Sequence, residues 1–282
     1  MKSSNAVSPK VSVCIPTYNH EKFIHQTFEG ILMQKTSFEI EIVIGDDAST
    51  DNAPQIIEEY AKQHPTLIKA FIHKENQGPK APKEFAGRNN VLMLLKACKG
   101  DYVAFCEGDD YWTDPLKLQK QVDFMEANPD YMICHHNMQV IYEDHSPEHF
   151  FNDTNQKIES TIKDILEDRW FMATASVLFR NHFRENDFVD WHSQAAAGDW
   201  ALMIQLAAIG KIHYIPEAMG VYRKHNAGLS NVHSSTNLWF LKNRRQMFVN
   251  VNEWLNYQYN HTIQQTLQAY DEQIQAYEAN FS

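Results

Sequence analysis

Hydrophobic runs with the length of buried strands recur through the first 106 residues, and polar residues follow each run. Apolar residues at helical spacing lie between these runs, as in Phe23–Leu32, and a further helix is expected around Arg88–Ala97. Strands that alternate with helices are typical of a doubly wound α/β sheet with mostly parallel strands. The expected strands are Val11–Ile15, Ile40–Ile44, Ile68–His73 and Tyr102–Cys106.

Three of these strands end in loops that carry polar or acidic side chains. The loops read PTYN at 16–19, GDDASTD at 45–51 and EGDD at 107–110. Because open α/β sheets bind ligands at the carboxyl edge of their strands, we expect the loops to meet in one site. Asp and Ser also cap helices, which is a structural alternative for each loop taken singly. Their convergence favours a nucleotide site, in which Asp47 accepts a hydrogen bond from a base or ribose while Thr17 and Tyr18 hold a flat ring.

The loop after the fourth strand brings three carboxylates close together, those of Glu107, Asp109 and Asp110. Neighbouring carboxylates repel one another unless a cation neutralises them, and oxygen ligands on a tight turn suit Mg²⁺ or Mn²⁺. The pattern therefore indicates a divalent metal site. The structural alternative is a solvated acidic loop, in which Asp114 caps the next helix ahead of Pro115.

The middle of the chain carries a predicted strand at Tyr131–Tyr142. Because neighbouring side chains on a strand face opposite sides, we expect one of His135 and His136 in the core and the other facing a cleft. The polar stretch 143–155 is predicted to form a loop over that cleft.

A helix is predicted to begin at Gly198-Asp199-Trp200 and to end near Ile209. This places Asp199 at a helix N-terminus, where a carboxylate caps the helix and interacts favourably with its dipole, an effect worth about 1 kcal/mol. Capping of the helix is the structural interpretation of Asp199.

The chain beyond about Ser230 is predicted to be helical, and its last helix carries an apolar stripe with heptad spacing. A narrow stripe of this kind packs on another helix, either within the chain or in a homodimer. The preceding segment combines aromatic residues such as Trp239 with Lys242, Arg244 and Arg245, so peripheral contact with a membrane is a second possibility. The stripe consists of Ile263, Leu267, Tyr270, Ile274, Tyr277 and Phe281.

Composition narrows the class of protein. The 282 residues include 25 Lys and Arg against 36 Asp and Glu, a net charge of -11 that argues against a nucleic-acid binder. No apolar run approaches the ~20 residues needed to cross a bilayer, and the start, MKSSNAVSPK, lacks the hydrophobic segment of a signal peptide. We therefore expect a cytoplasmic protein with a disordered lead at 1–10. Its four cysteines, in apolar surroundings and without metal spacing, are expected to be reduced core thiols.

Several short motifs, taken in order, resemble those of the family 2 glycosyltransferases, which have the nucleotide-sugar-binding GT-A fold. Each motif is unspecific alone, but their order over residues 10–225 rarely arises by chance. The matching pieces are Val11–Asn19 for the strand and P-x-Y-N, Ile44–Asp51 for V-D-D-x-S-x-D, Asn76-Gln77-Gly78 with Arg88-Asn89 for N-x-G and A-R-N, Glu107–Asp109 for D-x-D, and Tyr222–His225 for Y-R-x-H.

The resemblance implies a fold and a domain organisation. The fold would be an α/β, Rossmann-like GT-A domain with a mostly parallel central sheet flanked by helices, over residues 11–230. Residues 11–110 would form its nucleotide-binding half and 111–230 its acceptor half. A helical C-terminal extension would follow at 231–282.

The resemblance also implies roles for individual residues. In the family the last acid of D-x-D binds the metal that bridges the diphosphate, here Asp109, and an acid at the start of a late helix is the catalytic base, here Asp199. Arg88 would face the ribose or diphosphate, and His225 would complete the metal shell, contact the diphosphate or lie at the surface. The expected nucleotide-sugar contacts are Pro16, Thr17, Tyr18, Asn19, Asp47, Arg88, Glu107, Gly108 and Asp109, and the expected metal ligands are Asp109, Glu107, Asp110 and His225.

The implied activity is inverting, metal-dependent transfer of a sugar from a nucleoside-diphosphate sugar, expected to be a UDP-sugar, to a hydroxyl group. The cofactor would be Mn²⁺ or Mg²⁺, and the acceptor a saccharide, lipid-linked or protein molecule in cell-surface polysaccharide or glycoconjugate synthesis, in the cytoplasm or at the inner face of the membrane. Because no Q-x-x-R-W motif of processive synthases is found, single hexosyl transfers are expected. The alternatives are a non-catalytic nucleotide-binding or assembly protein of the same fold, and a nucleotidyltransferase.

Overall fold

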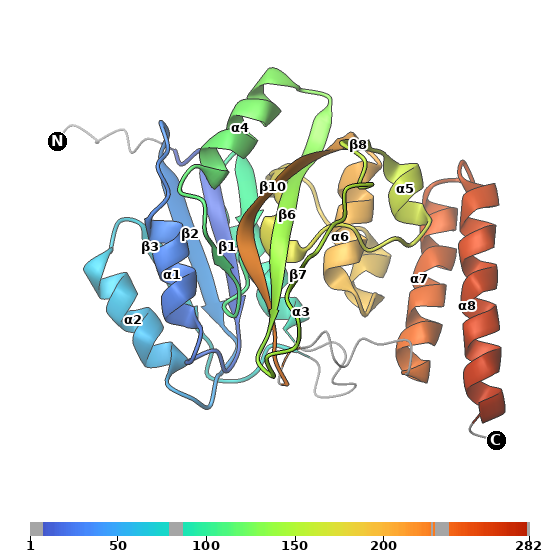
Figure 1. Ribbon diagram of the computed structural model, residues 1–282, viewed down its shortest axis with the longest axis horizontal. Coiled ribbons are helices and arrows are strands. Elements are labelled where there is room, and N and C mark those ends of the chain that lie inside the picture. The colour runs from blue at the N-terminus through green and yellow to red at the C-terminus, as the bar shows by residue number, and fades with distance from the viewer. Residues whose placement is uncertain (1–7, 79–86, 227, 229–236, 281–282) are drawn as a thin grey trace.

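The predicted parallel strands form one half of a larger mixed sheet (Figure 1). The computed structural model describes residues 8–78, 87–226, 228 and 237–280. The main path of the sheet has the order β3-β2-β1-β4-β9-β6-β10-β5, with β7 paired to β6 and β8 to β10. The strands are β1 (Val11–Thr17), β2 (Ile40–Asp46), β3 (Ile68–Ile72), β4 (Tyr102–Phe105), β5 (Tyr111–Trp112), β6 (Tyr131–Tyr142), β7 (His149–Phe150), β8 (Glu159–Ser160), β9 (Leu178–Arg180) and β10 (Lys211–Lys224).

The strand directions confirm the predicted parallel strands β1 to β4. The other half of the sheet contains both parallel and antiparallel pairs. β1 runs parallel to β2 and to β4, β2 runs parallel to β3, and β6 runs parallel to β10. Between these two groups, β9 is antiparallel to both β4 and β6. Because β1, β2 and β4 share one direction, the loops that follow them leave the sheet at the same edge.

Helices cover both faces of the sheet, as the alternation of apolar side chains along the strands requires. On β1, Val13 and Ile15 pack in one core cluster with α1, α2 and α4, whereas Cys14 packs in the other with α3, α5, α6, α7 and α8. All four cysteines are free and buried, as expected. The helices are α1 (Ile24–Leu32), α2 (Ala53–Gln63), α3 (Arg88–Ala97), α4 (Lys117–Ala127), α5 (Ile162–Leu166), α6 (Gly198–Ala207), α7 (Leu238–Trp254) and α8 (Asn260–Asn280).

The C-terminal helices α7 and α8 lie side by side at the end of the molecule opposite to α2 (Figure 1). The apolar stripe of α8 is buried within the chain at Ile263, Leu267, Tyr270 and Ile274, which confirms intramolecular packing for these positions. Phe281 lies outside the described residues. Homodimerisation stays a prediction.

The basic residues considered for membrane contact are held by acids of the same chain. Arg244 is buried and pairs with Asp168, Arg245 pairs with Asp271 at 2.5 Å, and Lys242 pairs with Glu278 at 2.8 Å. Among the residues that the structure describes, no helix is both long enough and apolar enough to cross a membrane. Peripheral membrane contact stays a prediction.

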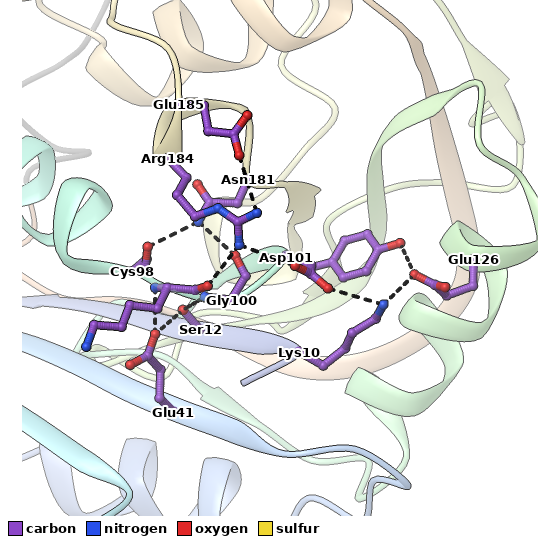
Figure 2. Close-up of polar contacts among 12 residues, drawn as sticks. Lys10, Ser12, Glu41, Cys98, Gly100, Asp101, Glu126, Asn181, Arg184 and Glu185 are labelled. Atoms are coloured by element: carbon purple, nitrogen blue, oxygen red, sulfur yellow. Dashed lines mark hydrogen bonds and ion pairs between the residues drawn. The ribbon is translucent and has the colours of Figure 1, made fainter. Parts of the chain in front are cut away.

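At the amino edge of the sheet, a polar network joins β1 to β4 (Figure 2). Lys10 pairs with Asp101 at 3.4 Å and with Glu126 at 2.9 Å, and the Ser12 hydroxyl accepts from the Gly100 backbone N–H at 2.8 Å. The end of the predicted disordered lead is therefore tied to the sheet at Lys10, while residues 1–7 lie outside the described part of the chain.

One prediction for the middle of the chain is wrong. Both His135 and His136 on β6 are fully buried, so neither side chain faces an open cleft. The core clusters on the two sides of the sheet enclose both faces of this strand. In the stretch 143–155, predicted as a loop, the short strand β7 pairs with β6.

Lys117, at the start of α4, is a buried cation. Its side chain is fully buried, and its Nζ lies 3.9 Å from the centre of the Trp112 ring. Within the described residues this amine has no hydrogen-bond partner. Burial lowers the pKa of Lys117 to about 7.

We expect Lys117→Met to raise the melting temperature at pH 6 by about 4 °C or more, and by less at pH 9. The folded-state pKa lies below the unfolded value of about 10.4, so the cost of the buried charge is complete below pH 7 and is lost as the pH rises toward 10.4. Calorimetry at the two pH values measures this difference. The exposed Lys62→Met is the control, and an equal gain at both pH values would contradict the assignment.

Candidate active site

The loops after β1 and β2 are held together by hydrogen bonds from their polar side chains. Asp46 accepts from the backbone N–H of Ser49 at 2.9 Å, and Asn19 Oδ1 accepts from the backbone N–H of Thr50 at 2.8 Å. Asn19 adopts a positive φ of 57°, a conformation that asparagine tolerates better than most residues. Asn19, which was predicted to contact the nucleotide sugar, therefore fixes the conformation of these two loops.

Asp47 is the most distinctive residue of this loop pair. Its backbone N–H donates to the Thr17 carbonyl at 3.0 Å, and its Oδ1 accepts from the Gln77 N–H at 2.5 Å. The residue is 1% exposed, and no donor among the described residues makes a well-formed hydrogen bond to its Oδ2, although the nearby backbone N–H of Gly87 acts to lower the pKa of this carboxylate. Burial raises the pKa of Asp47 above its ordinary value. A buried carboxylate oxygen of this kind is suited to accept a hydrogen bond from a ligand, for example from the N–H of a nucleobase. The Tyr18 side chain, 46% exposed, lies on the same loop as Thr17.

The carboxylate turn, residues 107–110, is fixed from α1 and from β1. The buried Thr27 hydroxyl contacts the Gly108 and Asp110 carbonyls at 3.0 and 2.7 Å, and the Gly108 N–H donates to the Pro16 carbonyl at 3.1 Å. The first and third of the predicted loops therefore meet as expected.

Asp109 lies in a cluster with two histidines. Its Oδ2 is 3.0 Å from Nε2 of His225 and 3.6 Å from Nε2 of His20, and the three candidate ligand atoms all lie within 4.8 Å of one another. Burial alone would raise the pKa of Asp109, but His20 and His225 outweigh it and hold that pKa below its ordinary value. Two imidazole nitrogens with a carboxylate oxygen suit first-row divalent metals, among which Mn²⁺ accepts both ligand types, better than Mg²⁺, which prefers oxygen ligands. His225 is 7% exposed, so the alternative of a surface histidine is wrong.

His20 was not among the predicted site residues. Its Nδ1 lies 3.1 Å from Oγ1 of Thr17, which orients the ring and leaves Nε2 toward Asp109. Gly108 makes room for this pair, because a Cβ there would stand 2.5 Å from Thr17 Oγ1 and 2.8 Å from His20 Nδ1. In the sequence, the only signal was that His20 directly follows the PTYN loop.

The other two acids of the turn lie outside the His20–Asp109–His225 cluster. Asp110 is buried, and its Oδ1 accepts from the Arg223 backbone N–H at 2.8 Å. Burial and then the charges of Asp109 and Glu107 hold its pKa well above its ordinary value. Burial, followed by the charge of Asp109, raises the pKa of Glu107 to about 8. Direct metal ligation by Asp110 and Glu107 stays a prediction, with one oxygen of Asp110 already occupied by the backbone.

Arg223 braces the turn and was likewise missed as a site residue. Its Nη1 donates to the Asp109 carbonyl at 2.6 Å, its Nη2 donates to Gln26 on α1 at 2.6 Å, and the guanidinium stacks 4.6 Å from the Phe23 ring centre. A cleft of about 520 Å³ opens beside this region. It is lined by Asn19, Glu21, Lys22, Phe23, Asp51, Glu143, Asp144, His225 and Asn226.

Asp199 lies in the first turn of α6, as predicted. Its Oδ2 is 3.3 Å from the Thr174 hydroxyl, and its Oδ1 accepts from the Trp200 N–H at 2.8 Å. The side chains of Thr174 and Asp199 both affect the pKa of Glu107, so the start of α6 and the carboxylate turn are neighbours. Asp199 therefore combines a helix-terminal position with proximity to Glu107 of the carboxylate turn.

Arg88 begins α3 but is directed to the loop before α6. Its guanidinium donates to the carbonyls of Ser193 and Ala195. Burial lowers its pKa to about 10, while the charge of Asp199 acts in the opposite direction. Its predicted contact with the ribose or diphosphate stays a prediction.

The sequence model of glycosyl transferase family 2 matches residues 12–209. The chain belongs to this family. The match includes the three loops, of which the carboxylate turn is the third, and Asp199, and it stops before α7 and α8.

Comparison with individual proteins agrees with this assignment. The uncharacterized protein Mb1547 of Mycobacterium bovis is 38% identical over 219 residues, which are 78% of this chain and 60% of that protein. S. aureus TarS 1-349, solved with UDP-GlcNAc, is 22% identical and covers 86% of this chain and 66% of its own, with a TM-score of 0.61. The Pyrobaculum calidifontis mannosyltransferase PcManGT, solved with GDP-Man and Mn²⁺, is 16% identical at a TM-score of 0.61, covering 97% and 76%. These solved structures establish the GT-A type of fold.

We expect Gly108→Ala to weaken Mn²⁺ binding by about tenfold or more, because the new methyl group would displace Thr17 or His20 and misorient the ligand atoms. Titration followed by electron paramagnetic resonance measures the free Mn²⁺. Gly198→Ala is the matched control, since a Cβ there meets its nearest atom at 3.7 Å. Unchanged Mn²⁺ affinity in a folded Gly108→Ala protein would contradict the assigned cluster.

Proposed function

We propose that this protein is an inverting, divalent-metal-dependent glycosyltransferase that moves one sugar from a nucleoside-diphosphate sugar to a hydroxyl group of an acceptor. The observation that carries the proposal is that one edge of the sheet holds both the His20–Asp109–His225 cluster and, joined through Thr174 and Glu107, the carboxylate of Asp199. One set of groups suits a diphosphate with its metal, and the other suits a proton acceptor.

The loops after β1 and β2 would bind the nucleoside. The buried Oδ2 of Asp47, without a well-formed hydrogen bond from the described residues, would accept a hydrogen bond from the base. The exposed ring of Tyr18 would cover the flat base. A nucleoside bound by these loops would point its diphosphate toward the carboxylate turn. The turn follows β4, and β1 lies between β2 and β4 in the sheet.

The carboxylate turn would hold the diphosphate through a divalent cation. His20, Asp109 and His225 offer the ligand atoms, and the protein adds rigidity through Thr27 and Arg223. A bound Mn²⁺ or Mg²⁺ would supply charge neutralisation for the leaving nucleoside diphosphate. This matters here because the ionised carboxylate of Asp109 would otherwise repel a ligand of the same sign.

Asp199 would take the proton from the acceptor hydroxyl. The Thr174 hydroxyl and the Trp200 N–H hold its carboxylate in place, so its geometry does not depend on the substrate. Attack from the side opposite the leaving diphosphate inverts the configuration of the anomeric carbon. The mechanism needs no nucleophile from the protein.

Comparisons support a nucleotide sugar as the donor and a divalent cation as the cofactor. TarS was solved with UDP-GlcNAc and PcManGT with GDP-Man and Mn²⁺, so proteins of this fold hold nucleotide sugars. We infer a UDP-sugar as donor, single transfers rather than polymerisation, and a role in cell-surface polysaccharide or glycoconjugate synthesis. A panel of UDP-, GDP- and dTDP-sugars with Mn²⁺ tests this choice.

We expect the binding of UDP or GDP to require a divalent cation. Titration calorimetry with Mn²⁺ should give a measurable affinity that EDTA removes, and Asp109→Asn should remove it as well. Equal affinity in the presence of EDTA would contradict the role of the cluster.

We expect Asp199→Asn to lower transfer by about two to four orders of magnitude while nucleotide binding stays nearly unchanged. Asn is also a good residue near a helix N-terminus, so thermal stability should change little and the loss would report the missing base. Near-normal turnover would reduce Asp199 to a structural role. A product with retained anomeric configuration, seen by NMR, would refute the mechanism.

A further inference from the structure

Trp170 is an exposed aromatic residue in the loop between α5 and the 3-10 turn at Thr174–Ser176. Its side chain is 45% exposed, whereas Trp112, Trp191 and Trp200 are buried. The exposed ring stacks on Trp200, with ring centres 4.7 Å apart and an angle of 22° between the planes. One face of the indole is therefore covered by protein, and the residue still leaves a large apolar area in water.

The stack lies next to the proposed base. Trp200 follows Asp199 in α6, and its backbone N–H donates to that carboxylate at 2.8 Å. The loop that carries Trp170 also reaches Asp199 from its other end, through the Thr174 hydroxyl at 3.3 Å. The exposed indole and the carboxylate are thus connected both through the ring stack and through a loop of only a few residues.

A buried cation from the C-terminal extension holds this stack in place. The Arg244 guanidinium carbon lies 5.9 Å from the Trp170 ring centre and 5.8 Å from that of Trp200. Arg244 is itself fixed by its ion pair with Asp168 and by its hydrogen bond to the Tyr270 hydroxyl at 3.1 Å. Cations over aromatic faces are attracted by the ring electrons, so Arg244 adds to the rigidity of the pair.

The same contacts fix the turn that leads into Trp170. Asp168 has a φ of 57°, in the left-handed region that costs energy for most residues other than glycine. Its carboxylate accepts from Arg244 and from the Tyr270 hydroxyl, which offsets this cost. The position of the exposed indole is therefore set before any ligand binds, which lowers the entropy cost of binding.

We propose that Trp170 is the platform of a saccharide acceptor subsite, on which the apolar face of a pyranose ring stacks so that one of its hydroxyl groups reaches Asp199. A pyranose ring offers C–H groups on one face and hydroxyl groups around its rim, which matches a flat indole beside a carboxylate. The inference rests on the proposed function and narrows its acceptor class: a sugar ring, rather than a protein side chain or a bare lipid alcohol, receives the transferred sugar.

Saturation-transfer NMR tests the subsite without depending on turnover. The probes are the p-nitrophenyl pyranosides of glucose, galactose, mannose and N-acetylglucosamine, each with the full chain, UDP and Mn²⁺. We expect at least one pyranoside to bind the wild-type protein, and Trp170→Ala to weaken that binding by about tenfold. Trp170→Phe should restore part of it, because a smaller flat ring remains. Calorimetric binding of UDP with Mn²⁺ should be the same in all three proteins.

A matched control and several outcomes make the test decisive. Tyr257→Ala removes another exposed aromatic side chain, 59% exposed, from the turn between α7 and α8, and should leave pyranoside binding unchanged. Pyranoside binding that is absent in the wild type, or unchanged in Trp170→Ala, would overturn the subsite. If UDP with Mn²⁺ binds in either case, the proposed donor site still stands. Loss of binding to phosphatidylglycerol vesicles in Trp170→Ala, with pyranoside binding intact, would assign the indole to a membrane surface instead.

Discussion

The site depends on two backbone hydrogen bonds that join the carboxyl ends of three parallel strands. The Asp47 N–H donates to the Thr17 carbonyl, and the Gly108 N–H donates to the Pro16 carbonyl. Both bonds continue the parallel registers of β1 with β2 and with β4 beyond the last paired residues. A change of one residue in either register would turn alternate side chains to the opposite face, so the position of Asp109 relative to Asp47 is set by the sheet.

The residues around the carboxylate turn determine how its negative charge is distributed. Three ionised carboxylates in one turn repel one another, and this costs free energy unless their surroundings shift their pKa values apart. Asp109 is balanced by His20 and His225, whereas Asp110 accepts a backbone N–H from Arg223 and Glu107 has a pKa raised to about 8. The turn therefore concentrates its negative charge on Asp109. A cation at this point meets one ionised carboxylate between two imidazoles, and the neighbouring acids add less repulsion than their number suggests.

The sequence was sufficient to predict the parallel half of the sheet and the meeting of its loops, because apolar strands followed by polar residues are local patterns. It also placed Asp199 at the start of α6, where a Gly-Asp-Trp sequence opens an apolar helix. It did not reveal His20 or Arg223 as site residues, since both act through partners far along the chain, at Asp109 and Gln26. Burial on both faces of β6 was missed for a similar reason, because the core clusters that cover its two faces draw residues from many elements along the chain.

The C-terminal helices contact the proposed acceptor side of the site, and they lie outside the residues that the family model matches. That match ends at residue 209, yet Arg244 of α7 reaches back to Asp168 and to the rings of Trp170 and Trp200. Removing one partner of a buried ion pair is strongly destabilising. A substitution of Asp168 in the loop before Trp170 would therefore also disturb α7, and a substitution of Arg244 would disturb that loop. A change in the extension would therefore alter the surroundings of Asp199 without touching the donor loops. In this chain the shared sheet edge forms the proposed donor side, and helices outside the shared region complete the proposed acceptor side.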